Sequence, residues 1–266
     1  MKKTTFPSWI TSASDFDPDK LEQMKMEHFN RESRPATDYD CPECGNKELI
    51  AYRREDGRCA LRDCTCRRIR RSIRLLKESG MESAVRGLTF DRFQAKDPWQ
   101  EQMLEVCRRY AAEPKGWLVL CGQSGSGKTH LCSAVCRELL LKGMAVRYMT
   151  WRADATTLKR LATDAQRDAL LDSYKNAQVL YIDDLFKTGA GADGQTRPTA
   201  ADVNLAFEIL NHRYFNRMIT ILSTEKSPLE LVNIDEATGS RIVELAGEQL
   251  VHIDRDSRKN YRLKEL

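Results

Sequence analysis

The sequence predicts an α/β fold in which a parallel sheet is flanked by helices, with a small additional module before it. From about Leu88 onward, short apolar runs alternate with longer segments of helical periodicity, which is typical of βαβ units. The chain has 266 residues, of which 41% are hydrophobic and 31% are charged. That length and composition suffice to bury one α/β core and to carry a small module.

The strands and helices of the α/β region are expected in a regular order. The apolar run at 117–121 (WLVLC) is typical of a buried parallel strand, and the helix that follows it ends at Gly143. Thr199 and Asp202 resemble a capping box at the start of a later helix. Three glycines indicate a flexible loop at 188–198. The remaining expected elements are strands at 145–150, 178–182 and 218–223, and helices at 128–142, 152–176, 199–215 and 236–247.

A glycine-rich segment lies between the first strand and its helix. Gly122 to Thr129 reads GQSGSGKT and matches G-x-x-x-x-G-K-S/T, the P-loop pattern, in the expected strand–loop–helix context. Backbone N–H groups of such a loop and the following helix N-terminus attract phosphates. We expect Lys128 to reach the β- and γ-phosphates of ATP and Thr129 to bind Mg²⁺. The residues expected to hold the nucleotide are Gly122, Gln123, Ser124, Gly125, Ser126, Gly127, Lys128, Thr129, His130 and Asp183.

Two aspartates follow the strand expected at 178–182. An acid delivered by an apolar strand, downstream of a P-loop, is the Walker B arrangement. Asp183 is expected to hold Mg²⁺ through water, and Asp184 to orient or deprotonate the attacking water. A glutamate often fills this second role, and the shorter side chain of Asp184 leaves the rate of hydrolysis open. The two motifs together predict an ATPase.

Nine cysteines are divided unevenly along the chain. Five of them lie within 26 residues and include a C-x-x-C pair and a C-x-C pair, a spacing that suits four-coordinate Zn²⁺. The favoured ligands are Cys41, Cys44, Cys64 and Cys66. Cys59 lies between the two pairs and is an alternative to Cys64 or Cys66, and free thiols are the alternative to a metal site. The remaining four are expected in the apolar core, namely Cys107, Cys121, Cys132 and Cys136.

Basic residues concentrate beside the second cysteine pair. The net charge of +4 is modest, so the distribution of charge is more informative than its total. Six basic residues fall within eleven positions that contain no acid: Arg67, Arg68, Arg70, Arg71, Arg74 and Lys77. Clustered arginine indicates contact with a nucleic-acid backbone, here single-stranded DNA. A solvated helix without a ligand is the alternative interpretation.

The chain is expected to contain three regions. Residues 1–37 hold an amphipathic helix at 21–31, residues 38–80 hold the cysteine module and the basic helix, and residues 81–266 form the ATPase domain. No stretch approaches the ~18 apolar residues that a membrane span needs. Residues 4–15 contain no apolar region typical of a signal peptide. These features predict a cytoplasmic protein without a membrane partner.

With these motifs, the chain resembles replicative helicase loaders of the DnaC/DnaI type, in the form common in Firmicutes and their phages. The resemblance covers nearly everything from Cys41 onward, including a Ser79-Gly80 hinge and both Walker motifs, whereas the first 37 residues match no known pattern. Other segments that carry it are Leu88-Thr-Phe-Asp91-Arg-Phe93, Pro198-Thr-Ala-Ala-Asp202, Asn211-His-Arg213-Tyr214, Leu222-Ser-Thr-Glu225, Gly239-Ser-Arg241 and Asn260-Tyr-Arg262.

The resemblance implies an AAA+ P-loop NTPase core with a five-stranded parallel sheet and no helical lid domain. It places Thr224, or Ser223 beside it, at the polar sensor 1 position. It places Arg241 as a finger that reaches the γ-phosphate of a neighbouring subunit, and Arg262 is a candidate for sensor 2. The implied function is ATP-dependent loading of a DnaB-type helicase onto single-stranded DNA, by a protein that forms a homo-oligomer on binding ATP.

Three other functions compete with the loader. A transposition helper ATPase of the IstB type has a very similar core, but does not typically carry a cysteine module. A small-molecule kinase would need an arginine-rich lid, which the sequence lacks. A zinc-containing DNA-binding regulator would use ATP as a ligand only.

Overall fold

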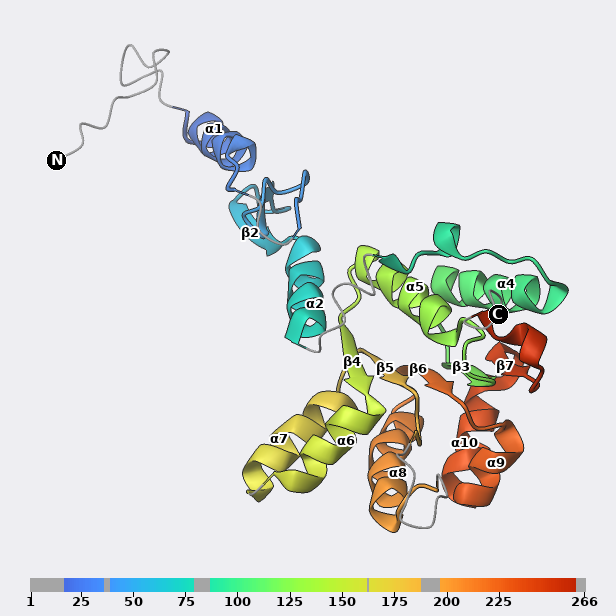
Figure 1. Cartoon of the computed structure of the whole chain (residues 1–266). Coiled ribbons are helices and arrows are strands. Elements are labelled where there is room, and N and C mark those ends of the chain that lie inside the picture. The colour runs from blue at the N-terminus through green and yellow to red at the C-terminus, as the bar shows by residue number, and fades with distance from the viewer. Residues whose placement is uncertain (1–16, 36–38, 79–86, 162, 188–196, 262–266) are drawn as a thin grey trace. The chain divides into compact units, whose positions relative to one another are not determined.

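The computed structural model describes residues 17–35, 39–78, 87–161, 163–187 and 197–261 (Figure 1). The chain divides into two compact units, Met1–Arg70 and Arg71–Leu266. The division into 1–37, 38–80 and 81–266 stays a prediction. The predicted hinge at 79–80, most of the predicted loop at 188–198 and the sensor 2 candidate Arg262 lie outside the described residues.

The first unit contains helix α1 (Pro18–Arg31) and an antiparallel hairpin of β1 (Leu49–Arg53) and β2 (Cys59–Asp63). Helix α1 begins three residues before the predicted start, because the Asp17 carboxylate caps its first turn. The hairpin was not among the predicted elements; its two strands are short, and of their ten residues five are exposed and one, Ala51, is buried. Helix α2 (Cys66–Glu78) begins in this unit and continues in the next.

The second unit is built on a five-stranded sheet in the order β4-β5-β6-β3-β7, in which all neighbouring strands are parallel. This confirms the predicted five-stranded parallel sheet. Its strands are β3 (Trp117–Gly122), β4 (Val146–Thr150), β5 (Val179–Asp183), β6 (Ile219–Thr224) and β7 (Leu250–Ile253). Four of them match the predicted apolar runs. Strand β7 was implied by the resemblance but not located in the sequence, because its four residues are only partly apolar and partly buried.

Helices cover both faces of this sheet (Figure 1). Helices α4 and α5 pack on one face, and α6 to α10 pack on the other. Their bounds are α4 (Pro98–Ala112), α5 (Lys128–Leu141), α6 (Trp151–Arg160), α7 (Asp164–Lys175), α8 (Ala200–Phe215), α9 (Pro228–Ile234) and α10 (Glu236–Ala246). Short 3₁₀ turns lie at η2 (Phe90–Arg92), η3 (Gly247–Gln249) and η4 (Ser257–Lys259).

The single helix predicted at 152–176 is wrong, because two helices occupy that range. Helix α6 ends at Arg160, and the Thr163 side chain accepts a hydrogen bond from the Gln166 N–H at the start of α7. Such a cap starts a new helix. The predicted capping box of Thr199 and Asp202 is present at the start of α8.

Alternate residues of each strand enter two separate apolar layers. In β3, Leu118 and Leu120 face the α4/α5 layer, whereas Trp117 and Val119 face the layer of α6 to α10. The four cysteines predicted in the core are fully buried, at 0–1% exposure. Among the described residues, no helix is long and apolar enough to span a bilayer. Since all strands run in parallel, their carboxyl ends meet at one edge, where ligands bind in folds of this kind.

Candidate functional site

The P-loop connects β3 to α5 at the carboxyl edge of the sheet. Gly122 has φ +106°, and a Cβ atom there would lie 2.0 Å from the Ile253 carbonyl oxygen, so only glycine fits. Gly127 has φ +93° directly before α5, and its Cβ would lie 2.7 Å from the Phe93 ring. The tight loop therefore leads straight into a helix N-terminus, which is the arrangement that binds phosphates.

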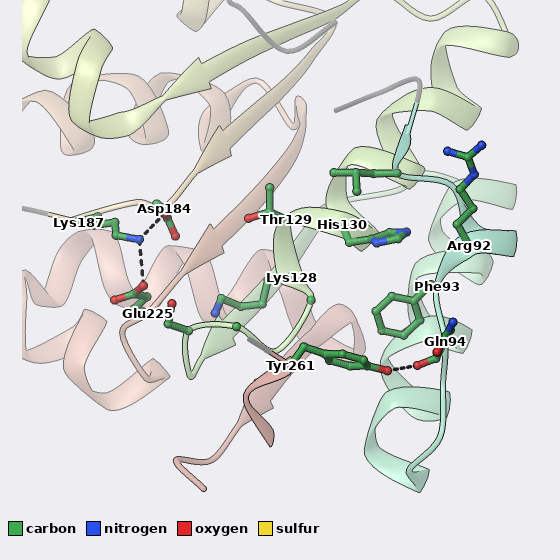
Figure 2. A pocket seen from close by; sticks show the side chains of 14 residues that line it. Arg92, Phe93, Gln94, Lys128, Thr129, His130, Asp184, Lys187, Glu225 and Tyr261 are labelled. Carbon is green, nitrogen blue, oxygen red and sulfur yellow. Dashed lines mark hydrogen bonds and ion pairs between the residues drawn. The ribbon is translucent and has the colours of Figure 1, made fainter. Parts of the chain in front are cut away.

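A cavity of about 590 Å³ opens beside this loop (Figure 2). Its size falls in the range typical of small-molecule sites. It is lined by Leu88, Arg92, Phe93, Gln94, Ser124, Gly125, Gly127, Lys128, Thr129, His130, Asp184, Lys187, Glu225 and Tyr261. The Tyr261 hydroxyl donates to the Gln94 carbonyl and joins the chain after β7 to the segment before α4. Phe93, Tyr261 and Arg92 thus lie on one side of the P-loop, and Asp184, Lys187 and Glu225 lie on the other (Figure 2).

The Lys128 side chain packs against the P-loop. Its side chain is only 5% exposed, and its Nζ donates to the carbonyl oxygens of Gly122 (2.8 Å) and Gln123 (2.6 Å). Burial lowers the pKa of Lys128, while the nearby carboxylates of Asp184 and Glu225 act in the opposite direction. The ammonium group is thereby held at the loop that was predicted to bind phosphates.

Asp183 lies at the end of β5 and accepts hydrogen bonds from four hydroxyl groups. Its Oδ1 accepts from Thr129 (3.1 Å), Tyr181 (2.7 Å) and Ser223 (2.5 Å), and its Oδ2 accepts from Tyr148 (3.0 Å). The structure therefore brings together Thr129 and Asp183, the two predicted magnesium ligands. A hydroxyl and a carboxylate are oxygen donors of the kind that Mg²⁺ prefers, so these residues fit the ion.

Asp184 forms the wall of the cavity together with a lysine and a second acid (Figure 2). Its backbone adopts φ +56°, and its N–H donates to the Ser223 hydroxyl (2.9 Å). Lys187 Nζ donates to Asp184 Oδ2 (2.7 Å) and to Glu225 Oε1 (3.0 Å). Burial alone would lower the pKa of Lys187, but these two hydrogen bonds outweigh it and raise the pKa. Lys187 therefore carries a positive charge between two acids.

Thr224 and Arg241 do not line this cavity. The buried Thr224 hydroxyl donates to the Leu185 carbonyl oxygen (2.7 Å), whereas its neighbour Ser223 reaches Asp183. Arg241 lies on α10 and is half-buried, with its guanidinium 5.4 Å from the ring centres of Phe207 and Tyr214. Of the two sensor 1 candidates, Ser223 is thus the one in contact with the predicted metal-binding carboxylate.

Several contacts within the candidate site were not predicted from the sequence. Tyr181 precedes Asp183 by two positions in a strand and therefore shares its face, a signal that the sequence contains. Tyr148 could be found only from the register of β4 and β5, in which it pairs with Tyr181. Glu225 directly follows β6, so the convergence of strand ends indicates it. Lys187 follows the Walker B strand by four positions and carries no pattern of its own.

In the first unit, four buried cysteines gather around one point. All four Sγ atoms lie within 4.8 Å of one another, with 3.7 Å between Cys41 and Cys64 and 3.4 Å between Cys44 and Cys66. Zinc–sulfur bonds of about 2.3 Å in a tetrahedron imply sulfur separations of about 3.8 Å. The donor set and spacing fit Zn²⁺. The structure groups the four favoured cysteines, and Cys59 lies outside the group, near the Glu22 carbonyl oxygen.

Hydrogen bonds from Arg70 hold the loop around this cluster in place. Its buried guanidinium donates to Asn46 Oδ1 (2.7 Å) and to the Tyr39 carbonyl oxygen (3.0 Å). Asn46 Oδ1 also accepts from the Cys41 N–H (2.8 Å). Arg70 was predicted to belong to a basic surface, and this is wrong, because the arginine is turned inward to satisfy loop oxygens. The neighbouring arginines on α2 that are exposed are Arg67, Arg68, Arg71 and Arg74.

Fold and site together define a P-loop ATPase of the AAA+ class. Residues 46–236 match the family model described as IstB-like ATP binding protein, and the chain belongs to that family. It is 35% identical over 229 residues to the phage-like element PBSX protein XkdC of Bacillus subtilis (strain 168), covering 82% of this chain and 84% of XkdC. The predicted resemblance to DnaC-type proteins related to the IstB group is confirmed.

Two further comparisons concern helicase loaders. The replicative helicase loader DnaC of Escherichia coli (strain K12) is 27% identical over 147 residues, which cover 52% of this chain and 59% of DnaC. The chain thus matches less than two thirds of that relative's length. A crystal structure of the DnaC helicase loader superposes with a TM-score of 0.54 and 24% identity, covering 62% of this chain and 96% of that one. This likeness shows the shared fold.

Proposed function

We propose that the protein is an ATP-dependent loader of a DnaB-type replicative helicase onto single-stranded DNA. The observation that carries the proposal is the nucleotide site at Lys128 and Asp183, built on a core that is similar to the loader DnaC. A cytoplasmic location is part of this proposal. ATP acts as the switch between an assembled and a released state.

In the proposed ATP cycle, Lys128 binds the β- and γ-phosphates, and Thr129 and Asp183 hold Mg²⁺. When bound there, Mg²⁺ would supply positive charge to offset the charge that develops on the phosphates during hydrolysis. Asp184 lies on the cavity wall, where it orients or deprotonates the attacking water. Ser223, in contact with Asp183, takes the sensor 1 role in preference to Thr224.

Hydrolysis is proposed to be slow in a monomer and faster in a homo-oligomer. Arg241 does not line the cavity of its own chain, and its half-buried guanidinium lies over Phe207, Tyr214 and Phe215. A finger supplied in trans raises phosphoryl-transfer rates by orders of magnitude. We assign that role to Arg241, which completes the site of a neighbouring subunit.

The cysteine cluster is proposed to bind a structural Zn²⁺ through Cys41, Cys44, Cys64 and Cys66. Apart from Tyr39 and Ile50, the buried cluster around them consists of the cysteines themselves. Metal binding supplies folding free energy in units this small. The region 38–80 would then offer a stable surface to the helicase, and the exposed arginines of α2 would contact single-stranded DNA.

The test is association with the replicative helicase of the host. Full-length protein is expected to co-purify with the helicase, and a variant of residues 81–266 is expected to lose the association while still binding ATP. Retained ATP binding shows that the shortened protein is folded. Association that persists in the shortened variant would contradict the role of the first 80 residues.

A transposition helper ATPase is the second candidate, because the matching family model is that of IstB-like proteins. The same co-purification carried out with a transposase in place of the helicase distinguishes the two. Binding to the transposase and not to the helicase would replace the loader proposal.

A further inference from the structure

The carboxylate of Asp183 is unusually well supplied with hydrogen-bond donors. A carboxylate offers about four lone-pair sites, two on each oxygen. Three hydroxyl groups donate to Oδ1 of Asp183 and one donates to Oδ2, which leaves Oδ2 a lone pair for the ion or for a water bound to it. The residue is only 8% exposed, so its surroundings are protein rather than water. With donors on both oxygens, the side chain is held in one orientation.

Two of the four donors are tyrosines that contact Asp183 from neighbouring strands. Tyr148 in β4 and Tyr181 in β5 are directly paired, with ring centres 5.2 Å apart. Their rings are buried, at 4% and 1% exposure. A buried hydroxyl without a partner is costly, and each of these finds its acceptor in Asp183.

Both tyrosines act as hydrogen-bond donors. The Tyr181 hydroxyl oxygen lies 2.7 Å from Asp183 Oδ1, and the Tyr148 hydroxyl oxygen lies 3.0 Å from Asp183 Oδ2. Because a carboxylate oxygen only accepts hydrogen bonds, each hydroxyl directs its proton at Asp183.

The other two donors have additional tasks. Thr129 is itself a predicted magnesium ligand, and Ser223 also accepts the N–H of Asp184. The tyrosine hydroxyls contact neither the P-loop nor Asp184, since their other side-chain partners are Thr150 for Tyr148 and Cys132 for Tyr181. Their removal would therefore change the support of Asp183 without touching the P-loop or Asp184.

We propose that Tyr148 and Tyr181 are positioning residues that hold the Asp183 carboxylate ready for Mg²⁺ and thereby set the magnesium dependence of ATP binding. Groups that orient metal ligands commonly contribute 10- to 100-fold to metal affinity. This inference rests on the proposed magnesium role of Asp183. It assigns a function to Tyr148, which lies outside the Walker motifs, and to Tyr181, which lies within the Walker B strand.

The test uses full-length Tyr148→Phe, Tyr181→Phe and the double variant. The dissociation constant of a fluorescent ATP analogue is measured against free Mg²⁺ and again in EDTA. In the double variant, the Mg²⁺ concentration for half-maximal tightening is expected to rise about 10-fold, with each single variant intermediate. Affinity in EDTA is expected to remain at the wild-type value.

Tyr110→Phe is the matched control. Tyr110 belongs to the same apolar layer and is equally buried, but its hydroxyl donates to the Gly116 carbonyl oxygen (3.0 Å). This variant loses a buried hydrogen bond away from Asp183, so its Mg²⁺ dependence should equal that of the wild type. Thermal unfolding of all variants shows which of them are folded. If Tyr181→Phe is not folded, the test relies on Tyr148→Phe, which removes only the longer of the two hydrogen bonds to Asp183.

Two results would overturn the inference. One is a wild-type Mg²⁺ dependence in the double variant. The other is an equal loss of affinity with Mg²⁺ and in EDTA, which would mean a structural role only. A wild-type protein whose ATP binding ignores Mg²⁺ would instead contradict the proposed magnesium site itself, so the two failures are distinguishable.

Discussion

The nucleotide site and the cysteine cluster obtain their geometry in different ways. Around Lys128 and Asp183, two apolar layers fix the strand ends, and polar contacts within the protein hold both side chains. The cysteine cluster has almost no apolar layer of its own. Contacts within the protein hold the nucleotide site, whereas the cysteine cluster is proposed to depend on a bound zinc ion for its stability.

Removing zinc should have the largest effect and should affect only the first unit. Structural zinc contributes about 10 kcal/mol or more to folding in zinc-finger peptides. Chelation, or Cys66→Ser, is expected to unfold the region around the hairpin while ATP affinity changes less than about twofold. Stoichiometric metal analysis, amide-resolved NMR and ATP titration measure these outcomes.

The control for this experiment is Cys59→Ser, since Cys59 lies outside the cluster. It should keep one zinc per chain. Zinc lost from Cys59→Ser and retained in Cys66→Ser would show that the ligand set is different. If the first unit stays folded after chelation, the cysteine cluster does not depend on zinc for its stability, and the proposed difference between the two regions is wrong.

Lys128→Ala should have the next largest effect, which is a loss of ATP affinity confined to the second unit. Loss of a buried charged donor to phosphate costs about 2–3 kcal/mol, or about 30- to 150-fold in ATP affinity. Unfolding of the core should be little changed. Lys142→Ala, at the end of the same helix, is the control, because Lys142 donates to the carbonyls of Ala111 and Ala112. Equal ATP affinity in both variants would contradict the assignment of Lys128.

Arg70→Ala and Arg71→Ala separate the effect of a buried arginine of α2 on stability from the effect of an exposed one on DNA binding. Arg70→Ala leaves loop oxygens without their donor and should destabilise the zinc-loaded first unit by about 2 kcal/mol. Arg71→Ala should leave stability unchanged but weaken single-stranded DNA binding and reduce its dependence on salt. Denaturant titration and DNA binding at several salt concentrations separate the two. Equal stability losses would show that both side chains are structural.

A smaller effect is expected at Lys187, between Asp184 and Glu225. Lys187→Ala leaves two carboxylates unbalanced beside the phosphates, and repulsion of about 1 kcal/mol should weaken ATP binding about fivefold. Adding Glu225→Gln removes one of these charges and should restore most of the affinity. ATP titration of both variants checks the expectation. Tighter ATP binding by Lys187→Ala would mean that Lys187 does not offset these charges.

The sequence was informative where a pattern follows from local physics. The P-loop from Gly122 to Thr129 and the acid after β5 were located because phosphate and metal binding restrict residue types at fixed spacing. Tyr148 was not located, since its contact with Asp183 depends on the pairing of β4 with β5. Arg70 was misjudged because helical periodicity alone did not show that the loop around Asn46 needs a buried donor.

Loading of the helicase itself tests the central proposal most directly. On closed circular single-stranded DNA, a ring helicase cannot enter from an end, so its appearance on the circle reports loading. The account predicts that the wild-type protein with ATP places the host helicase on the circle and that Lys128→Ala does not. Helicase that enters the circle equally well without the protein, or with Lys128→Ala, would contradict an ATP-switched loader.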